Sequence, residues 1–335
     1  MPQRDELSGG LKVPVQEHKA IDALHQDPSH QTAGLQGMNI FITGAQSFVG
    51  RALRAECRSK DISVTGLDLS PCDEPGIYQG DINDKELAAL IPEQVDAIVH
   101  LAALSSDGAC RGRSIPCFET NCMGTLNVIE AAQRRNARQF IFASSEWVYT
   151  DFVEGEPKDE NSVIDVHKLT SEYALSKIVS EVSLRHHHLS GFCNTTVLRF
   201  GIIFGSRMGN WSAVETIYDS VLRKTSIEVG SVRTGRHFVH VSDVARAILK
   251  AIGLPGFEII NVQGDRCISL GEIIQASMDL TGKTPAVTEL SPGQPDVRQI
   301  KNDKAKKVLE WTPRVGLRTG LVQLRQFLDR SWGQG

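Results

Sequence analysis

The sequence lacks the features that mark a membrane protein or a nucleic-acid binder. No apolar stretch approaches the roughly 20 residues that a membrane-spanning helix needs. The formal net charge is −4, with 36 lysines and arginines against 40 acidic residues, so no excess of positive charge offers a surface for phosphate backbones. We therefore expect neither a membrane-spanning segment nor a nucleic-acid partner.

Paired cysteine motifs are missing as well. The chain has seven cysteines, an odd number, and none of them forms a Cys-x-x-Cys pair. Cys110, Cys117 and Cys122 fall close together but without metal-ligand spacing. Free thiols are typical of a reducing compartment, so we expect a cytoplasmic protein with no metal site.

The N-terminal residues 1–37 lack aromatic residues altogether. They also lack the apolar segment that a signal peptide needs, and we expect a disordered tail. The remaining chain is long enough for two lobes with a large core. We place a dinucleotide-binding domain at 38–205 and a lobe that is mostly substrate-binding at 206–335, with segments that return to the core.

From Met38 onward, strand-like and helical patterns alternate, which is typical of a parallel sheet covered by helices on both faces. This predicts an α/β fold, a Rossmann-type doubly wound parallel sheet with a smaller C-terminal lobe. The expected strands are Met38–Thr43, Ile62–Leu67, Ala97–Ala102, Gln139–Ser144 and Thr195–Arg199. The expected helices are Arg51–Ser59, Lys85–Leu90, Glu119–Arg134 and Lys168–Arg185.

The first strand runs into a glycine loop and a helix. Gly44 and Gly50 keep the outer spacing of a dinucleotide-binding loop, although Ser47 stands where a middle glycine is common. Glycine lets the backbone approach a pyrophosphate, and the helix N-terminus supplies N–H groups. Asp68 ends the next strand, where a carboxylate can accept both ribose hydroxyls and would repel a 2′-phosphate. The pattern favours NAD over NADP.

Three residues near the middle of the chain form a candidate acid/base set. Tyr173 and Lys177 are four residues apart and share a helix face, and the fourth strand runs into Ser144 and Ser145. A neighbouring ammonium favours a phenolate, and a nearby hydroxyl can hydrogen-bond it. Taken alone, such a spacing would be a chance occurrence on a partly exposed helix more often than not.

Together, these motifs and others in the right order resemble the extended short-chain dehydrogenase/reductases of the nucleotide-sugar epimerase/dehydratase family. The resemblance runs from Met38 to about Leu328 and includes Gly80-Asp81-Ile82, His100-Leu101-Ala102-Ala103, Asn121 with Gly124-Thr125, Val148-Tyr149, Arg236 to Asp243, and Leu309-Glu310-Trp311.

The resemblance implies a role for each matched residue. Tyr173 is the general base, Ser145 bridges to the substrate hydroxyl, and Lys177 binds the nicotinamide ribose and tunes Tyr173. The implied NAD contacts are Gly44, Ser47, Phe48, Val49, Gly50, Asp68, Asp81, Ile82, Leu101, Ala102, Ala103, Asn121, Tyr173 and Lys177. The implied substrate contacts are Ser105, Ser145, Glu146, Arg236 and Arg298. Read without the resemblance, Arg236 fits a solvated basic loop equally well.

Departures from the family pattern leave the substrate and reaction open. Ile202 replaces an asparagine that helps hold substrate phosphates in the family. Dehydratases usually carry an acid immediately before Val-Tyr, where this chain has Trp147, with Glu146 one place earlier. We expect NAD-dependent epimerisation of a nucleotide sugar, with UDP-sugar 4-epimerisation through a 4-keto intermediate as the leading reading. A dehydratase or decarboxylase, a carbonyl reductase and a non-catalytic dinucleotide sensor remain as alternatives. The resemblance also implies a homodimer built on the helices at Glu119–Arg134 and Lys168–Arg185.

Overall fold

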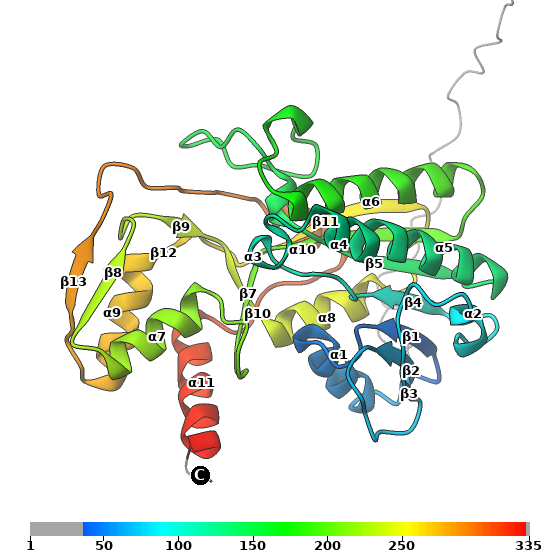
Figure 1. The fold of residues 1–335 in the computed structure, drawn as a ribbon, viewed down its shortest axis with the longest axis horizontal. Helices are drawn as coiled ribbons and strands as arrows, with labels where there is room; N and C mark the ends of the chain where they lie inside the picture. The colour runs from blue at the N-terminus through cyan, green and yellow to red at the C-terminus, as the bar shows by residue number, and fades with distance from the viewer. Residues whose placement is uncertain (1–35, 333–335) are drawn as a thin grey trace, which may run out of the picture. The chain divides into compact units, whose positions relative to one another are not determined.

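A seven-stranded sheet organises the computed structural model, which describes residues 36–332. The predicted tail at 1–37 therefore lies almost wholly outside the described residues. The strand order is β11-β6-β5-β4-β1-β2-β3, and every pairing is parallel (Figure 1). The strands are β1 (Asn39–Thr43), β2 (Ser63–Asp68), β3 (Ile77–Gln79), β4 (Ala97–His100), β5 (Gln139–Ser145), β6 (Asn194–Phe200) and β11 (Phe257–Val262). The predicted doubly wound sheet is confirmed.

Side chains alternate between the two faces of this sheet, as the period of two along a strand requires. In β1, Ile40 and Ile42 join one buried cluster, whereas Phe41 joins the other. The first cluster is covered by α1 (Phe48–Arg58), α8 (Val241–Ala251) and α10 (Asp303–Val308), and the second by α2 (Leu87–Leu90), α5 (Gly124–Arg134) and α6 (Glu172–Leu189). Both faces are thus buried, which explains why the strands are apolar throughout.

A separate apolar core lies in the C-terminal part of the chain. It is built from α7 (Ala213–Arg223), α9 (Leu270–Thr281) and α11 (Leu317–Trp332), with the parallel pair β8 (Ser226–Val229) and β13 (Ala286–Glu289). Capping boxes at Ser212–Glu215 and Ser269–Glu272 begin α7 and α9. Between this core and the sheet lie β7 (Ile202–Phe204) paired with β10 (Phe238–His240), and β9 (Gly235–Arg236) paired with β12 (Ile268–Ser269).

All four predicted helices differ from their predicted bounds: α1 begins at Phe48 rather than Arg51, and α2 at Leu87 rather than Lys85. α6 begins at Glu172 rather than Lys168, because the Ser171 hydroxyl caps it by accepting from Ala174 N, and Val166–Lys168 forms a separate 3₁₀ turn, η4. The helix expected from Glu119 starts with a π-helical turn, η2 (Glu119–Met123), before α5 continues it. Within the part of the chain that the structure covers, no helix has the length and apolar character to cross a bilayer.

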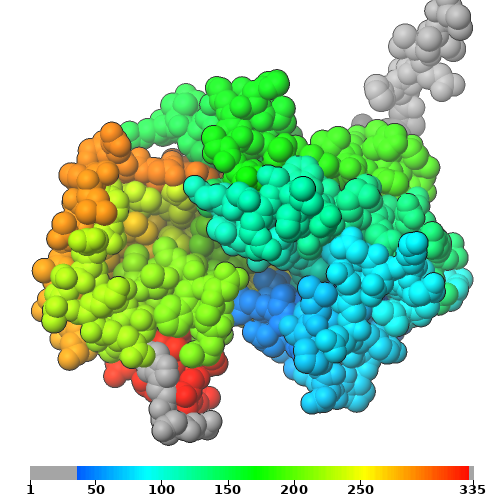
Figure 2. All heavy atoms as spheres, in the orientation of Figure 1, coloured from blue at the N-terminus to red at the C-terminus, as the bar shows by residue number. Residues whose placement is uncertain are grey.

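The surface is hollowed between the two groups of elements. Figure 2 shows the hollow between the blue and cyan atoms of the first half and the yellow-green atoms beyond about residue 205. Parallel α/β sheets bind ligands at the carboxyl ends of their strands, and the hollow leads to that edge.

Candidate active site

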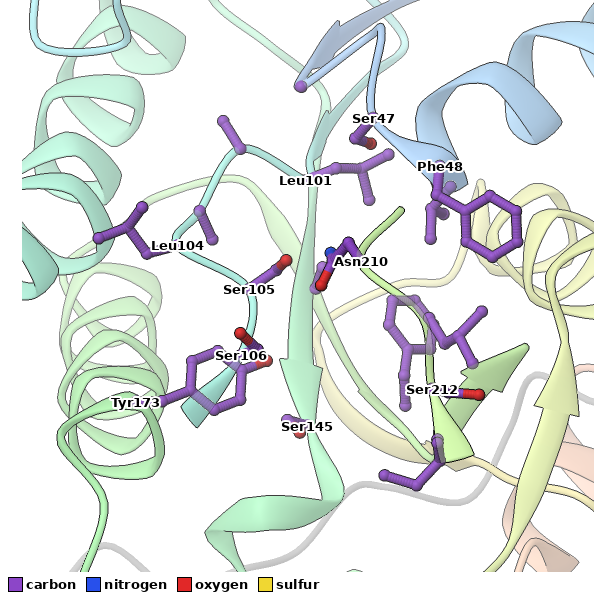
Figure 3. Close-up of a pocket in the computed structure, with 18 of the residues that line it drawn as sticks. Ser47, Phe48, Leu101, Leu104, Ser105, Ser106, Ser145, Tyr173, Asn210 and Ser212 are labelled. Atoms are coloured by element: carbon purple, nitrogen blue, oxygen red, sulfur yellow. The ribbon is translucent and has the colours of Figure 1, made fainter. Parts of the chain in front are cut away.

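A cavity of about 810 Å³ opens at the carboxyl ends of β1, β2, β4 and β5. Residues from the C-terminal elements, among them Arg236 and Phe238, close its other side. Figure 3 shows Ser47 and Phe48 at one end, and Tyr173 and Ser145 at the other. A volume of this order suits a ligand larger than a single small metabolite.

The glycine loop between β1 and α1 forms a close-fitting turn at one end of the cavity. Gly44 has φ +70°, and a Cβ there would lie 2.8 Å from Ala102 N. A Cβ on Gly50 would lie 2.3 Å from Gly44 O. Ser47 takes the place of the middle glycine because its hydroxyl caps α1, accepting from Gly50 N at 3.0 Å. The loop therefore fits a pyrophosphate at a helix N-terminus.

Carboxylates lie where an adenosine would extend from that loop. Asp68, at the end of β2, accepts hydrogen bonds from Gln46 N at 2.8 Å and Ser70 N at 2.9 Å. Each oxygen keeps a lone pair free for a ribose hydroxyl. Asp81 and the buried Ile82 line the cavity beside it. Together with the glycine cradle, this donor and acceptor set fits NAD.

The loop after β4 forms the cavity wall between the two ends. Leu101, Ala102, Ala103 and Ser105 all line it, as the resemblance implied. Asn121 does not line it; the side chain lies beneath the loop, with Oδ1 accepting from Leu104 N at 2.8 Å and Nδ2 donating to Leu104 O at 3.1 Å. Its amide also donates to Ser176 Oγ on α6. Asn121 thus ties the wall to the helix that carries Tyr173.

The predicted acid/base residues meet at the other end. Tyr173 projects from α6 near the loop of Ser105 and Ser106, with Ser145 at the end of β5 (Figure 3). Burial raises the pKa of Tyr173 to about 12, while its hydrogen bond with Ser145 lowers that pKa. Lys177 Nζ lies 5.8 Å from the Tyr173 ring centroid and donates to Ala143 O at 2.8 Å. Burial lowers the pKa of Lys177 to about 8.

These two pKa shifts define what the set can do. A phenol with a pKa near 12 stays protonated at neutral pH, so it begins as a proton donor. Lys177 keeps most of its charge at pH 7, and that charge is the nearest support for a phenolate. Proton removal by Tyr173 thus needs further positive charge in the cavity.

The residues next to Ser145 do not continue the strand. β5 ends at Ser145, and Glu146–Val148 form a 3₁₀ turn, η3. The turn directs Trp147 to the cavity wall and leaves Glu146 fully buried, with both carboxylate oxygens lacking a partner in the described structure. Burial raises the pKa of Glu146 to about 7, and the charges of Arg236 and Arg298 oppose the rise.

The two arginines predicted to bind substrate have different positions. Arg236 lines the cavity and pairs with Asp296. Arg298 does not line it; its guanidinium carbon lies 5.0 Å from the Trp147 ring centroid and 5.5 Å from that of Phe152, and it also pairs with Asp296. Arg298 therefore supports the wall from behind.

The segment before α7 closes the cavity opposite the β4 loop. Its lining residues are Arg207, Asn210, Trp211, Ser212 and Ala213. The Arg207 guanidinium lies 4.4 Å from the Phe48 ring centroid and pairs with Glu215 at 3.2 Å, which links the segment to the glycine loop. Ile202 also lines the cavity and presents an apolar side chain there, at the position for which the resemblance implied a departure. In the sequence, only the Ser-x-x-Glu capping box at the start of α7 marks the end of this loop.

Comparisons with known proteins identify the family of the chain. A model of the NAD dependent epimerase/dehydratase family matches residues 40–262. A UDP-glucuronate 4-epimerase from Thermodesulfobacterium geofontis is 29% identical over 307 residues, covering 84% of this chain and 93% of the relative. A dTDP-glucose 4,6-dehydratase from Streptomyces niveus is 26% identical, covering 88% and 94%. The structure of a UDP-glucose 4-epimerase from Thermotoga maritima with UDP-glucose has a TM-score of 0.79 at 24% identity, covering 88% of this chain and 100% of that one.

Proposed function

Because the chain belongs to the NAD-dependent epimerase/dehydratase family, we propose that it is an NAD-dependent 4-epimerase of a UDP-sugar. The observation that carries the proposal is the meeting of Tyr173 and Ser145 at one end of a cavity whose other end is the Gly44–Gly50 cradle. The names of the relatives support the substrate class, since they include UDP-sugar 4-epimerases.

In the proposed reaction, side chains of this protein transfer the proton of the sugar hydroxyl. In its phenolate form, which requires the added positive charge described above, Tyr173 takes the proton of the sugar hydroxyl, and Ser145 hydrogen-bonds both oxygens. Lys177 supplies positive charge beside the phenolate, although its direct bond in the structure is to Ala143 O. NAD, held as described below, would supply the hydride acceptor and donor for the sugar carbon, so the hydride that leaves is the hydride that returns. Tyr173 then gives its proton back, so no net proton or electron is consumed.

The cofactor would be held by the residues that fit it. The backbone N–H groups of Phe48 and Val49, at the N-terminus of α1, would face a pyrophosphate, Asp68 would accept from the adenosine ribose, and Asp81 and Ile82 would flank the adenine. The loop of Leu101 to Ala103 packs along the cofactor, and Asn121 holds that loop in place.

The substrate site is proposed on the C-terminal side of the cavity. Arg236 supplies a guanidinium for the diphosphate, a charge-assisted contact suited to phosphate oxygens. Ile202 cannot donate to a phosphate, so Arg236 carries more of that contact than in relatives with an asparagine. Ser105 lies beside Tyr173 and is assigned to a sugar hydroxyl.

A 4,6-dehydratase is the second candidate, and the buried carboxyl of Glu146 beside Ser145 is the observation that favours it. Elimination of water needs an acid/base pair beyond Tyr173. The side chain that reaches the cavity wall is Trp147, whose indole N–H does not titrate and so cannot act as a general acid or base. We therefore rank epimerisation first.

The outer face of α6 suggests a homodimer. Leu175, Val179 and Val182 have exposed fractions of 38%, 37% and 64%, and they lie at i, i+4 and i+7 on one face. Met123, at the start of the neighbouring α5, is also exposed. A second copy of the same face would bury this surface. The seven free cysteines suit a reducing compartment, and we infer a cytoplasmic location from them.

Product analysis tests the proposal. Purified protein with NAD should convert UDP-glucose to UDP-galactose without consuming NADH, and Tyr173→Phe should reduce that rate by about 10²-fold or more. A 4-keto-6-deoxy product would establish the dehydratase instead. Turnover by Tyr173→Phe at the wild-type rate would remove Tyr173 from the chemistry.

A further inference from the structure

Glu146 is the buried group that the proposed mechanism leaves unused. It has no exposed surface, and neither carboxylate oxygen has a hydrogen-bond partner within the described residues. An unpartnered buried carboxyl is costly to the folded state. A buried unpartnered group in a native protein needs a specific explanation, and interaction with a bound ligand is one such explanation.

The position of Glu146 places it directly behind the sugar end of the cavity. The residues on either side of it in the chain, Ser145 and Trp147, both line the cavity. Its charge acts on Tyr173 and is acted on by Arg236, and both of these side chains line the cavity as well. A charge at this position is felt by a bound sugar without direct contact, because the surrounding wall is buried and screens little.

The positive charges of Arg236 and Arg298, which lie near Glu146, are matched by two carboxylates. Asp296 pairs with both Arg236 and Arg298, and Glu146 provides the second negative charge of this group. A UDP diphosphate at Arg236 would add further negative charge. A carboxylate on the sugar would then be repelled by Glu146 with no compensating cation from this group, whereas a neutral sugar hydroxyl meets no such repulsion.

We propose that Glu146 is a specificity-determining residue that favours nucleotide sugars with an uncharged sugar ring over uronates. The inference rests on the proposed function, since it assumes a UDP-sugar in the cavity. This selectivity would distinguish UDP-glucuronate from UDP-glucose, the two substrates that appear in the names of relatives of this chain.

The protonation of Glu146 makes the selectivity depend on pH. The charged and titratable groups that act on it are Arg236, Arg298, Asp296, Tyr173 and Cys267. Because the pKa of Glu146 is raised to about 7, the carboxyl is mostly neutral at pH 6 and mostly charged at pH 8. Discrimination against a uronate should therefore increase across this interval.

The test compares UDP-glucose with UDP-glucuronate at fixed NAD. In the wild type, the ratio of kcat/KM for glucose to glucuronate should rise severalfold between pH 6 and pH 8. Glu146→Gln should lower the ratio at pH 8 by about tenfold, mainly by lowering KM for the uronate, and should abolish its pH dependence. The control is Glu154→Gln, an exposed glutamate shortly after the same strand, which removes the same charge and should leave the ratio unchanged.

Binding measurements test the role of Glu146 independently of whether the protein is an epimerase. Affinities of both sugar nucleotides for NAD-loaded Tyr173→Phe and Tyr173→Phe/Glu146→Gln proteins require no turnover. If neither sugar is epimerised but the double variant binds UDP-glucuronate about tenfold more tightly than the single variant, the proposed reaction fails and the role of Glu146 stands. If epimerisation occurs and the ratio is the same in wild type and Glu146→Gln at both pH values, the role of Glu146 is overturned and the epimerase stands.

Discussion

Removal of Glu181 should destabilise the protein strongly, because this carboxylate is buried with its partner behind the catalytic helix. Glu181 lies one turn after Lys177 on α6 and accepts from Arg199 Nε at 3.1 Å and from an Arg199 terminal nitrogen at 2.6 Å. Both side chains are only 5% exposed. Ser144 Oγ also donates to Glu181, and Arg199 donates to Tyr149 Oη at 3.0 Å.

The magnitude follows from what remains after the change. Glu181→Ala leaves the Arg199 guanidinium buried without its counter-ion, and loss of one partner of such a pair costs about 3–5 kcal/mol. With an unfolding entropy of about 2 cal/mol/K per residue over the 335 residues, Tm should fall by about 4–7 °C. Glu181 also raises the pKa of Lys177, so the variant should weaken the charge available to Tyr173.

Thermal and urea unfolding measure this directly. The matched control is Glu130→Ala, which breaks the Glu130–Arg134 pair on α5, where both side chains are 60% or more exposed. An exposed pair contributes about 0.5 kcal/mol or less. If Glu181→Ala costs no more than this control, the buried pair does not stabilise the fold as argued. A double variant with both Glu181 and Arg199 replaced by methionine should recover much of the loss, since no charge is then left unpaired.

Three further predictions concern the cofactor and the buried carboxyl. Asp68→Ala should weaken NAD binding by about 10-fold or more while improving relative use of NADP, because charge-assisted bonds to the ribose are lost; wild-type preference for NADP would show the assignment to be wrong. Gly50→Ala should reduce NAD affinity by at least about tenfold in titrations, since its Cβ would meet Gly44 O, whereas Gly230→Ala, which meets nothing within 4 Å, should bind NAD normally. Glu146→Gln should stabilise the protein at pH 8 by up to about 3 kcal/mol and by little at pH 4.5. The pKa of this carboxyl is raised from 4.5 to about 7 in the folded protein, so the unfolded chain loses the proton at a lower pH and the folded state is destabilised above it. Urea unfolding that shows an equal difference at both pH values would exclude this titration.

Much of the cofactor half could be predicted from the sequence because its signals are local. β1 and β4 are short apolar runs, and the positions of Gly44, Gly50 and Asp68 follow from strand-loop-helix spacing alone. Tyr173 and Lys177 are four residues apart on one helix, so their common face needed no tertiary information.

The remainder of the site depends on contacts between distant segments, which no local pattern encodes. The turn after Ser145 places Trp147 in the cavity wall and Glu146 behind it, whereas the resemblance implied a substrate contact for Glu146. The place of Asn121 beneath the β4 loop is set by its bonds to Leu104. Arg298 stacks on Trp147, which is far from it in the sequence. The positions of these side chains could be found only from the three-dimensional structure.

The most direct test of the central claim is the fate of UDP-glucose labelled with deuterium at C4, incubated with purified protein and NAD. We expect UDP-galactose that retains the deuterium at C4, because the hydrogen leaves and returns within the same cavity, and we expect no exchange with added NADH. Net consumption of NADH with a reduced product, or loss of the label to the medium, would contradict it.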